Sequence, residues 1–201
     1  MKIDSARFEL SAPDLKSCPR WALPEFAFIG RSNVGKSSLL NMLTGRRDLA
    51  KVSVTPGKTK LLNFFVINDR WSLVDLPGYG FAVVGHKERD EFNAAVSDFL
   101  EKRKGLVCVF VLIDSRLPPQ RIDLQFLRWL TDASVPFALV FTKTDKQSDT
   151  RTRASMDEFT RTLAEGGVEA PAVFASSAKT KKGRAELLGF IGETLANHGR
   201  G

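Results

Sequence analysis

One glycine-rich segment of the sequence has the residue types and the spacing to hold a phosphate chain. It fits the pattern G-x-x-x-x-G-K-[ST] and lies between a strand expected over 25–29 and a helix expected over 37–43. Its glycines permit a tight turn whose N–H groups face phosphate oxygens, and the positive end of the helix points at the same oxygens. Lys36 would reach the terminal phosphates and act in catalysis, and Ser37 would ligate Mg²⁺. The predicted nucleotide-binding residues of this segment are Gly30, Arg31, Ser32, Asn33, Val34, Gly35, Lys36, Ser37 and Ser38.

A second motif, Asp75-Leu76-Pro77-Gly78, follows a strand expected over 71–75 and would complete the phosphate and metal site. Asp75 would reach Mg²⁺ through water, and the N–H of Gly78 would donate to the terminal phosphate, which is a catalytic role. The loop at 53–59 lies between the two motifs and contains Thr55 and Thr59. Either threonine could complete the Mg²⁺ shell, and the spacing does not choose between them.

Two further motifs would read the base of the nucleotide. Thr142-Lys143-Thr144-Asp145 ends a strand expected over 136–142, and Asp145 can accept hydrogen bonds from both the ring N–H and the exocyclic amine of guanine. Adenine lacks this pair of donors, so the carboxylate would select guanine. The stem of Lys143 would lie over the base plane. In Ser176-Ser177-Ala178-Lys179, after the last strand, the N–H of Ala178 would meet the guanine carbonyl.

These motifs need a sheet whose strands end at one edge, and the apolar pattern predicts such a sheet. Short apolar runs alternate with amphipathic segments, which is typical of a mostly parallel sheet with helices on both faces. Together with the phosphate loop this predicts an α/β P-loop GTPase fold with six strands, one of them antiparallel in a hairpin around 68–69. Strands are expected over 25–29, 60–67, 71–75, 106–114, 136–142 and 172–176, and helices over 37–43, 88–102, 119–131, 152–164 and 183–196. Residues 25–196 would form the GTP-binding domain, with a loosely attached N-terminal extension at 1–24 and a C-terminal tail at 197–201.

The composition is that of an ordinary globular protein in a reducing compartment. Hydrophobic residues make up 43% of the 201 and charged residues 26%, which excludes a disordered or collagen-like chain. No apolar stretch is long enough to span a membrane, and residues 1–10 lack the apolar core of a secretory signal, so we expect a cytoplasmic protein without a membrane partner. Cys18 and Cys108 are not expected to form a disulfide.

The charge balance favours a phosphate-rich partner. Lys and Arg number 30 against 23 Asp and Glu, a net charge of +7. The surplus gathers around 46–60, 143–153 and 179–184, in loops expected to rim the nucleotide crevice. We predict RNA contacts from Arg46, Arg47, Lys51, Lys181 and Lys182. The alternative is that these charges only neutralise the nucleotide.

Over about residues 24–195 the chain resembles the translation-factor-related GTPases, and within them the EngB (YihA/YsxC) family of bacterial ribosome-biogenesis GTPases. The resemblance is carried by GRSNVGKS, PGKT, DLPG, TKTD and SSAK, and more specifically by LPGYG and DSRLPP. It implies nucleotide contacts from Pro56, Gly57, Lys58 and Thr59, with Thr59 rather than Thr55 as the Mg²⁺ ligand. It also implies action on ribosomal RNA in large-subunit assembly, with a link to cell division and septation. We expect a monomer. The chain departs from the family pattern outside the nucleotide motifs, at Lys60, Val83 and Leu117.

Tyr79 stands where many small GTPases carry the glutamine that orients the attacking water. A phenol is not expected to orient water in the same way, so intrinsic hydrolysis should be slow or depend on a partner. In related GTPases an asparagine at the position of Asn33 helps to hold K⁺ near the phosphates, and we expect K⁺ here. The alternative is a loop asparagine that tolerates an unusual backbone angle.

The sequence therefore predicts a GTP-binding switch with slow hydrolysis. One alternative is an ATPase or nucleotide kinase, which the T-K-x-D motif disfavours. The other is a nucleotide-dependent RNA- or ribosome-binding module with negligible turnover, which the absence of the glutamine leaves open.

Overall fold

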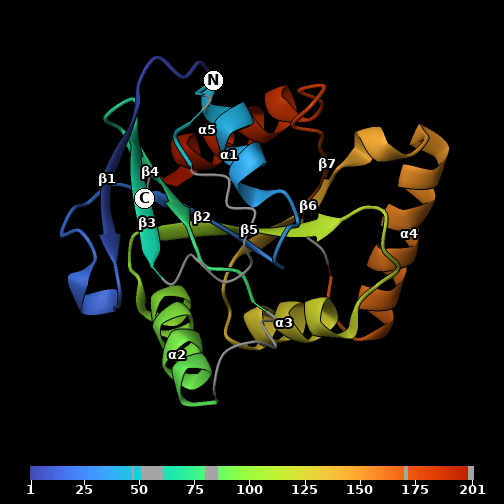
Figure 1. The fold of residues 1–201 in the computed structure, drawn as a ribbon, viewed down its shortest axis with the longest axis horizontal. Coiled ribbons are helices and arrows are strands. Elements are labelled where there is room, and N and C mark those ends of the chain that lie inside the picture. Colours follow the sequence, from blue (N-terminus) through green and yellow to red (C-terminus); the bar gives the residue numbers. More distant parts are fainter. Residues whose placement is uncertain (47, 51–60, 80–85, 170–171, 199–201) are drawn as a thin grey trace.

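The computed structural model describes residues 1–198 apart from 47, 51–60, 80–85 and 170–171, and for residues 86–93 it describes the backbone alone. A seven-stranded sheet with the order β1-β3-β4-β2-β5-β6-β7 forms the centre of the described chain (Figure 1). β3 runs antiparallel to both of its neighbours, and the other pairs are parallel. The expected α/β fold is therefore confirmed.

The elements expected from the sequence are present, with ends shifted by no more than three residues. The strands are β1 (Ala6–Ala12), β2 (Glu25–Gly30), β3 (Leu62–Ile67), β4 (Trp71–Asp75), β5 (Leu106–Asp114), β6 (Phe137–Thr142) and β7 (Val173–Ala175). The helices are α1 (Lys36–Thr44), α2 (His86–Lys102), α3 (Arg121–Asp132), α4 (Asp149–Glu165) and α5 (Arg184–His198).

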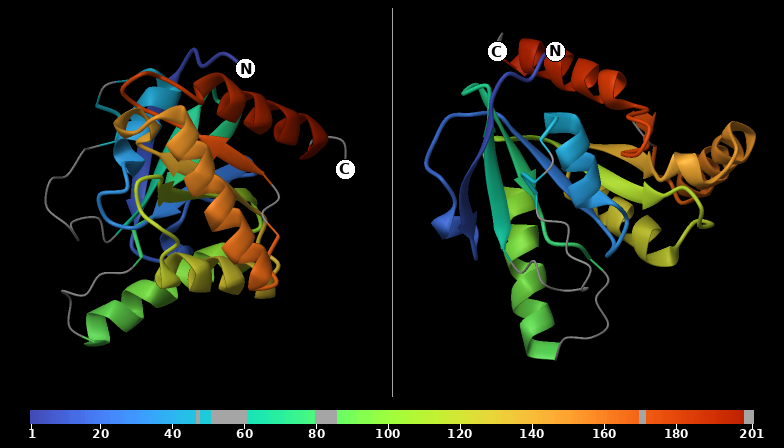
Figure 2. Two further views of the ribbon diagram at one scale, coloured as in Figure 1. Left: turned by 90° about the vertical axis from the view of Figure 1, so that its right-hand side faces the viewer. Right: turned by 45° about the horizontal axis from the view of Figure 1, so that its top comes forward.

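Helices cover both faces of the sheet and divide the core into two layers (Figures 1 and 2). α1 and α5 pack on one face, where Leu40 and Leu187 are fully buried against Phe110 of β5. On the other face the buried side chains of α2, α3 and α4 form a second cluster, which includes Phe99 and Leu127. No helix in the described ranges is long and apolar enough to cross a membrane.

The central strands are buried on both sides, as their continuous apolar runs indicate. Every residue of β2 and β6 is buried. Phe28 of β2 stacks on Phe110 of β5 at 4.8 Å between ring centroids on one face, whereas Ile29 faces the other layer. Because β2, β4, β5, β6 and β7 run parallel, their carboxyl ends meet at one edge of the sheet, where the predicted motifs lie.

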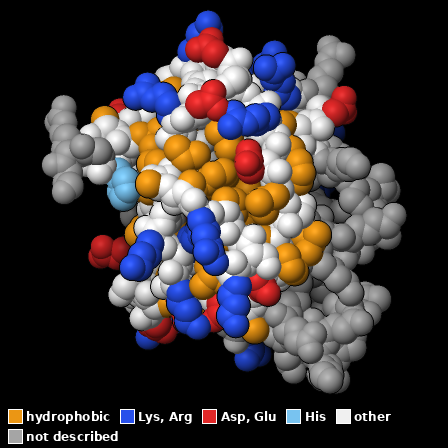
Figure 3. All heavy atoms as spheres, turned by 90° about the vertical axis from the view of Figure 1, so that its left-hand side faces the viewer, with side chains coloured by type: hydrophobic (Ala, Val, Ile, Leu, Met, Phe, Trp, Pro, Cys, Tyr) orange, Lys and Arg blue, Asp and Glu red, His pale blue; other side chains and the backbone are white. Residues whose placement is uncertain are grey.

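The N-terminal extension is not loosely attached, and this expectation was wrong. Residues Ala6–Ala12 form β1, which pairs with β3 at the edge of the sheet and makes seven strands rather than six. Only Ala12 of this strand is buried, and Phe8 is 53% exposed. Because so little of the strand is buried, its sequence has no apolar run from which a strand could be predicted. The face at this edge gathers apolar side chains with Lys and Arg side chains around them (Figure 3). At the other end, residues 197–198 belong to α5 rather than to a tail.

A buried carboxylate links the segment between β1 and β2 to the residue that follows α2. Glu25 is fully buried and accepts hydrogen bonds from Trp21 Nε1 at 2.6 Å and from Arg103 Nε at 2.9 Å and Nη2 at 2.6 Å. Arg103 also donates to the carbonyl of Pro19 at 2.7 Å. These contacts join the extension to the end of α2, and they compensate the cost of burying the charge of Glu25. Cys18 nearby is a buried free thiol, as is Cys108 in β5.

Candidate nucleotide-binding site

The loop between β2 and α1 has the backbone geometry that phosphate binding requires. Gly35 has a φ of 104° and Asn33 a φ of 60°, conformations that favour glycine and that asparagine tolerates. Gly35 is the N-cap of α1 and supplies no side-chain hydrogen bond to the first N–H groups of the helix. Those N–H groups are the donors that an anion at a helix N-terminus uses. The backbone angle of Asn33 agrees with the alternative interpretation of that residue, a loop asparagine in an unusual conformation.

Lys36 and Asp75 meet across the site. The Lys36 ammonium contacts Oδ1 of Asp75, and the two side chains are only 13% and 7% exposed. Lys36 begins α1 and Asp75 ends β4, which pairs with β2. The fold therefore brings the cation of the first motif to the carboxylate of the second, so that both can face one terminal phosphate and its metal.

The oxygen donors beside this pair fit Mg²⁺. Ser37 supplies a hydroxyl from the first turn of α1 and Asp75 supplies a carboxylate, and Mg²⁺ prefers such hard oxygen ligands. Within the described ranges no three His, Cys, Asp or Glu side chains gather into a metal-binding group. Waters and the nucleotide phosphates would therefore complete the shell, as is usual for Mg²⁺. The remaining candidates belong to the loop at 53–59, which we call the first switch. They lie outside the described residues and are Thr55, Pro56, Gly57, Lys58 and Thr59.

Gly78 lies directly against the phosphate loop. A Cβ on this residue would stand 2.6 Å from the carbonyl oxygen of Gly30 and 3.5 Å from the backbone nitrogen of Ser32, so no other residue type fits without a shift of the backbone. The next residue, Tyr79, forms a parallel β-bridge with Arg31 of the loop. The second motif is thus held beside the backbone N–H groups that would cradle the phosphates.

The segment predicted to read the base is tied to the phosphate loop and to the segment after β7. Thr142 Oγ1 donates to the carbonyl of Val34 at 2.6 Å. The N–H and the hydroxyl of Thr144 both donate to the carbonyl of Ser176, at 3.2 and 3.1 Å. Three loops that are distant in the sequence are therefore joined at the carboxyl edge of the sheet.

Asp145 lies in a setting that keeps it ionised. Ser177 Oγ donates to its Oδ1 at 2.7 Å, and this hydrogen bond is the main cause that lowers the pKa of Asp145. Lys146 and Lys179 add a smaller electrostatic contribution of the same sign. Ala178, which follows Ser177, is half-buried. An ionised carboxylate at this position can accept the two hydrogen bonds that guanine offers.

Asp114, at the end of β5, is a site residue that the motif analysis did not assign. Its Oδ2 accepts from Lys143 Nζ and from Arg116 Nη2, each at 2.8 Å. Although burial opposes its ionisation, these hydrogen bonds lower the pKa of Asp114 to about 2. Lys143 also donates to the carbonyl of Asn33, so its stem is stretched between β5 and the phosphate loop. The signal that could have identified Asp114 is its place at a strand end, which it shares with Asp75.

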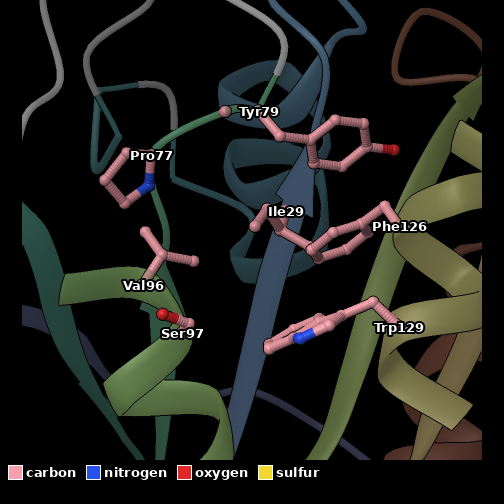
Figure 4. Close-up of a pocket in the computed structure, with 8 residues that line it drawn as sticks. Ile29, Pro77, Tyr79, Val96, Ser97, Phe126 and Trp129 are labelled. Atoms are coloured by element: carbon pink, nitrogen blue, oxygen red, sulfur yellow. The ribbon is translucent and has the colours of Figure 1, made fainter. Parts of the chain in front are cut away.

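Tyr79 directs its side chain towards α3. Its hydroxyl donates to Oδ1 of Asp123 at 2.9 Å, and its ring stacks on Phe126 with 4.4 Å between centroids. The ring borders a cavity of about 250 Å³ between the second motif, α2 and α3 (Figure 4). The hydroxyl is thus engaged by a protein carboxylate, which agrees with the expectation that Tyr79 does not replace the missing glutamine. The lining residues are Ile29, Pro77, Gly78, Tyr79, Val96, Ser97, Phe126 and Trp129.

Arg46 and Lys181, two of the residues predicted to contact RNA, flank one junction between two helices. Arg184 donates to the carbonyls of Met42 and Leu43, each at 2.9 Å, and so joins the start of α5 to the end of α1. Exposed Arg46 follows α1, and exposed Lys181 precedes α5. Lys182 is also exposed and lies 2.5 Å from Asp149 of α4. Arg47 and Lys51 lie outside the described residues.

Known proteins resemble the chain over nearly its whole length. The model of the 50S ribosome-binding GTPase family matches residues 25–143. A probable GTP-binding protein EngB from Bacteroides thetaiotaomicron is 49% identical over 191 residues, which cover 95% of each chain. Its counterpart from Christiangramia forsetii is 47% identical over 191 residues, which cover 95% of this chain and 96% of the relative.

Solved structures share the fold at lower sequence identity. The crystal structure of a probable GTP-binding protein engB superposes with a TM-score of 0.69 and 21% identity, over 86% of this chain and 99% of that one. The structure of Era in complex with MgGDPNP and nucleotides of 16S ribosomal RNA gives a TM-score of 0.67 and 21% identity, over 84% of this chain and 55% of that one. With these likenesses and the motifs joined at one edge of its sheet, this chain belongs to the EngB family of GTP-binding proteins and is a GTPase.

Proposed function

We propose that this chain is a GTP-dependent switch that acts in assembly of the large ribosomal subunit and hydrolyses GTP slowly by itself. The observation that carries the proposal is the contact of Lys36 with Asp75 at the carboxyl edge of the sheet, where Ser177 also orients Asp145, in a chain matched by a family described as 50S ribosome-binding. The proposal includes a cytoplasmic location and a link to cell division and septation, which the resemblance to the EngB family implies.

The nucleotide is bound by four segments that the described contacts join. In this proposal the segment 30–38 cradles the phosphates, and Mg²⁺ is held by Ser37, by Asp75 through water and by Thr59. Asp145 reads guanine, and Lys143 lies over the base. The hydrogen bond from Ser177 to Asp145 supports this assignment, because it orients an ionised carboxylate in the segment that follows β6.

Hydrolysis is slow because the residue after Gly78 cannot supply an amide to the attacking water. The hydroxyl of Tyr79 is bound to Asp123, and its ring is stacked on Phe126. A K⁺ ion held with the help of Asn33 would supply positive charge where the transition state needs it. Asn33 is exposed at the phosphate loop, which supports access for such an ion.

The partner is ribosomal RNA of the large subunit or its precursor. The exposed basic residues Arg46 and Lys181 flank the junction of α1 and α5, and the first switch follows α1 in the sequence. A change in the first switch on GTP binding would therefore alter the RNA surface beside it. Because phosphate contacts release counterions, binding should weaken as salt rises.

Co-sedimentation with purified large subunits tests this proposal. We expect more protein to pellet with a non-hydrolysable GTP analogue than with GDP, and GTP turnover to rise when subunits are added. Pelleting that is indifferent to the nucleotide would contradict the switch. Binding to subunits with no turnover at all would favour the alternative, a nucleotide-dependent ribosome-binding module.

A further inference from the structure

A buried carboxylate of α3 connects the two phosphate-binding motifs. Asp123 is only 3% exposed, and its Oδ1 accepts the hydrogen bond from the Tyr79 hydroxyl at 2.9 Å. Its other oxygen, Oδ2, lies 3.8 Å from Nη1 of Arg31 in the phosphate loop. One side chain thus contacts the residue after Gly78 and the residue after Gly30. A carboxylate buried to this extent needs such partners, because an unpaired buried charge is costly.

The ring of Tyr79 is also held in place by stacking on an aromatic side chain of α3. Tyr79 stacks on Phe126 with 26° between the ring planes, and Phe126 stacks on Trp129 at 5.8 Å. Figure 4 shows the three rings in a column beside the cavity, with the Tyr79 hydroxyl directed away from it. Burial, followed by the neighbouring carboxylate, raises the pKa of Tyr79 well above its ordinary value. The phenol therefore stays protonated and remains a donor throughout the physiological pH range.

The backbone next to this tyrosine is the part of the second motif that would meet the nucleotide. Tyr79 forms a β-bridge with Arg31, and Gly78 packs so closely on Gly30 that it has no room for a Cβ. The Gly78 peptide is therefore held through Tyr79, by the backbone bridge to Arg31 and by the anchored side chain. Movement of Tyr79 off α3 would release both constraints together.

We propose that Asp123 is a positioning residue for the GTPase reaction: by holding Tyr79 and Arg31 it keeps the N–H of Gly78 beside the phosphate loop, where the γ-phosphate would lie. This proposal rests on the proposed role of Gly78 at the terminal phosphate. GDP has no γ-phosphate, so loss of the anchor lowers the affinity for GTP and leaves the affinity for GDP unchanged. A role in packing α3 alone would change both affinities together or neither.

Three substitutions separate the hydrogen bond from the packing. Tyr79→Phe keeps the ring and its stack on Phe126 but lacks the hydroxyl. Asp123→Ala removes the acceptor, whereas Asp123→Asn keeps an amide oxygen that can accept from Tyr79. Asp132→Asn is the matched control, because Asp132 is a carboxylate of the same helix whose side chain is 64% exposed.

The measurement is the dissociation constant of each variant for GDP and for a non-hydrolysable GTP analogue, in Mg²⁺ buffer, with fluorescent nucleotides. We expect Tyr79→Phe and Asp123→Ala to lower the preference for the analogue over GDP about threefold to tenfold, the range of one lost hydrogen bond. GDP affinity should stay within about twofold. Asp123→Asn should recover most of the preference, and Asp132→Asn should match the native protein.

An equal loss of both affinities, an unchanged preference or a stronger preference for the analogue would overturn the inference. If Asp123→Ala does not fold, Tyr79→Phe decides the question alone, because its ring keeps the packing. Failure of the native protein to bind GDP is a different result, since it would contradict the nucleotide site itself.

Discussion

Ser177 donates a hydrogen bond from its hydroxyl to Oδ1 of Asp145 at 2.7 Å, although the two residues are 32 positions apart. The contact joins the segment after β7 to the segment after β6. It lowers the pKa of Asp145 and limits the rotation of its carboxylate. The group proposed to read guanine is therefore oriented by a residue of another motif, and the two motifs act as one unit.

Replacement of Asp145 should change the base that the protein binds. Asp145→Asn loses a charged acceptor for two guanine donors, so GTP affinity should fall about 10-fold to 100-fold, the range for hydrogen bonds to a charged group. The affinity for xanthine nucleotides should rise, because their carbonyl replaces the exocyclic amine of guanine and can accept a hydrogen bond from the new amide. Competition of GTP, XTP and ATP for a fluorescent nucleotide measures this.

Ser177→Ala serves as the companion variant and should weaken GTP binding about threefold to tenfold without creating a preference for xanthine. Equal affinity of the native protein for ATP and GTP would show that Asp145 does not read the base.

Removal of the phosphate-loop cation should abolish tight binding without unfolding the protein. Lys36→Ala deletes the ammonium that contacts Asp75, and Ser37→Ala deletes a proposed Mg²⁺ ligand. We expect both variants to lose GTP affinity at least about tenfold, since each removes a charged or metal contact to the phosphates. Lys102→Ala, an exposed lysine in α2, is the control. Normal GTP binding by Lys36→Ala in Mg²⁺ buffer would refute the assignment of the loop.

Hydrolysis should depend on the monovalent cation. We expect faster GTP turnover in KCl than in NaCl at equal ionic strength, because K⁺ would supply the positive charge that the engaged Tyr79 does not. Asn33 has a φ of 60°, so Asn33→Gly removes its side-chain carbonyl without straining the loop, and Asn33→Ala tests the same loss with strain added. Both variants should turn over GTP equally in the two salts. Identical rates for the native protein would rule out the K⁺ site.

Loss of basic charge at the α1–α5 junction should weaken binding to the large ribosomal subunit and leave the affinity for GTP unchanged. Arg46→Glu reverses an exposed charge, and Arg47 can be reversed with it. Lys181→Asn removes a charge at a φ of 62°, which asparagine tolerates. Each lost phosphate contact should also reduce the salt slope of binding by about 1. Arg161→Glu, exposed in α4, is the matched control. An equal loss in the control would mean that only net charge matters.

The buried pair of Arg103 and Glu25 should be a main source of stability for the N-terminal segment. Arg103→Ala leaves Glu25 fully buried without its cation, and such a loss costs about 3–5 kcal/mol of unfolding free energy. Lys102→Ala, at the neighbouring exposed position, should cost no more than about 0.5 kcal/mol. Urea unfolding followed by circular dichroism compares them. A similar small cost for both variants would show that the pair does not stabilise the fold.

The sequence by itself determined the central sheet and most of the nucleotide site. β2, β5 and β6 carry continuous apolar runs, as strands covered by helices on both faces do, and such runs are visible without a structure. The phosphate loop, Asp75 and Asp145 were predictable because each needs a particular residue type at a particular distance from a strand end.

Only the tertiary structure decided which residues support that site. β1 escaped prediction because an edge strand is held by backbone pairing and buries only Ala12, so its composition carries little signal. Asp114, Ser177 and Asp123 were not assigned their roles because a positioning side chain is defined by its partner in space. Asp123 meets Tyr79, which lies 44 residues away, and no local spacing encodes that distance. Local chemistry can be read along the chain, whereas contacts between distant segments exist only once the sheet has assembled.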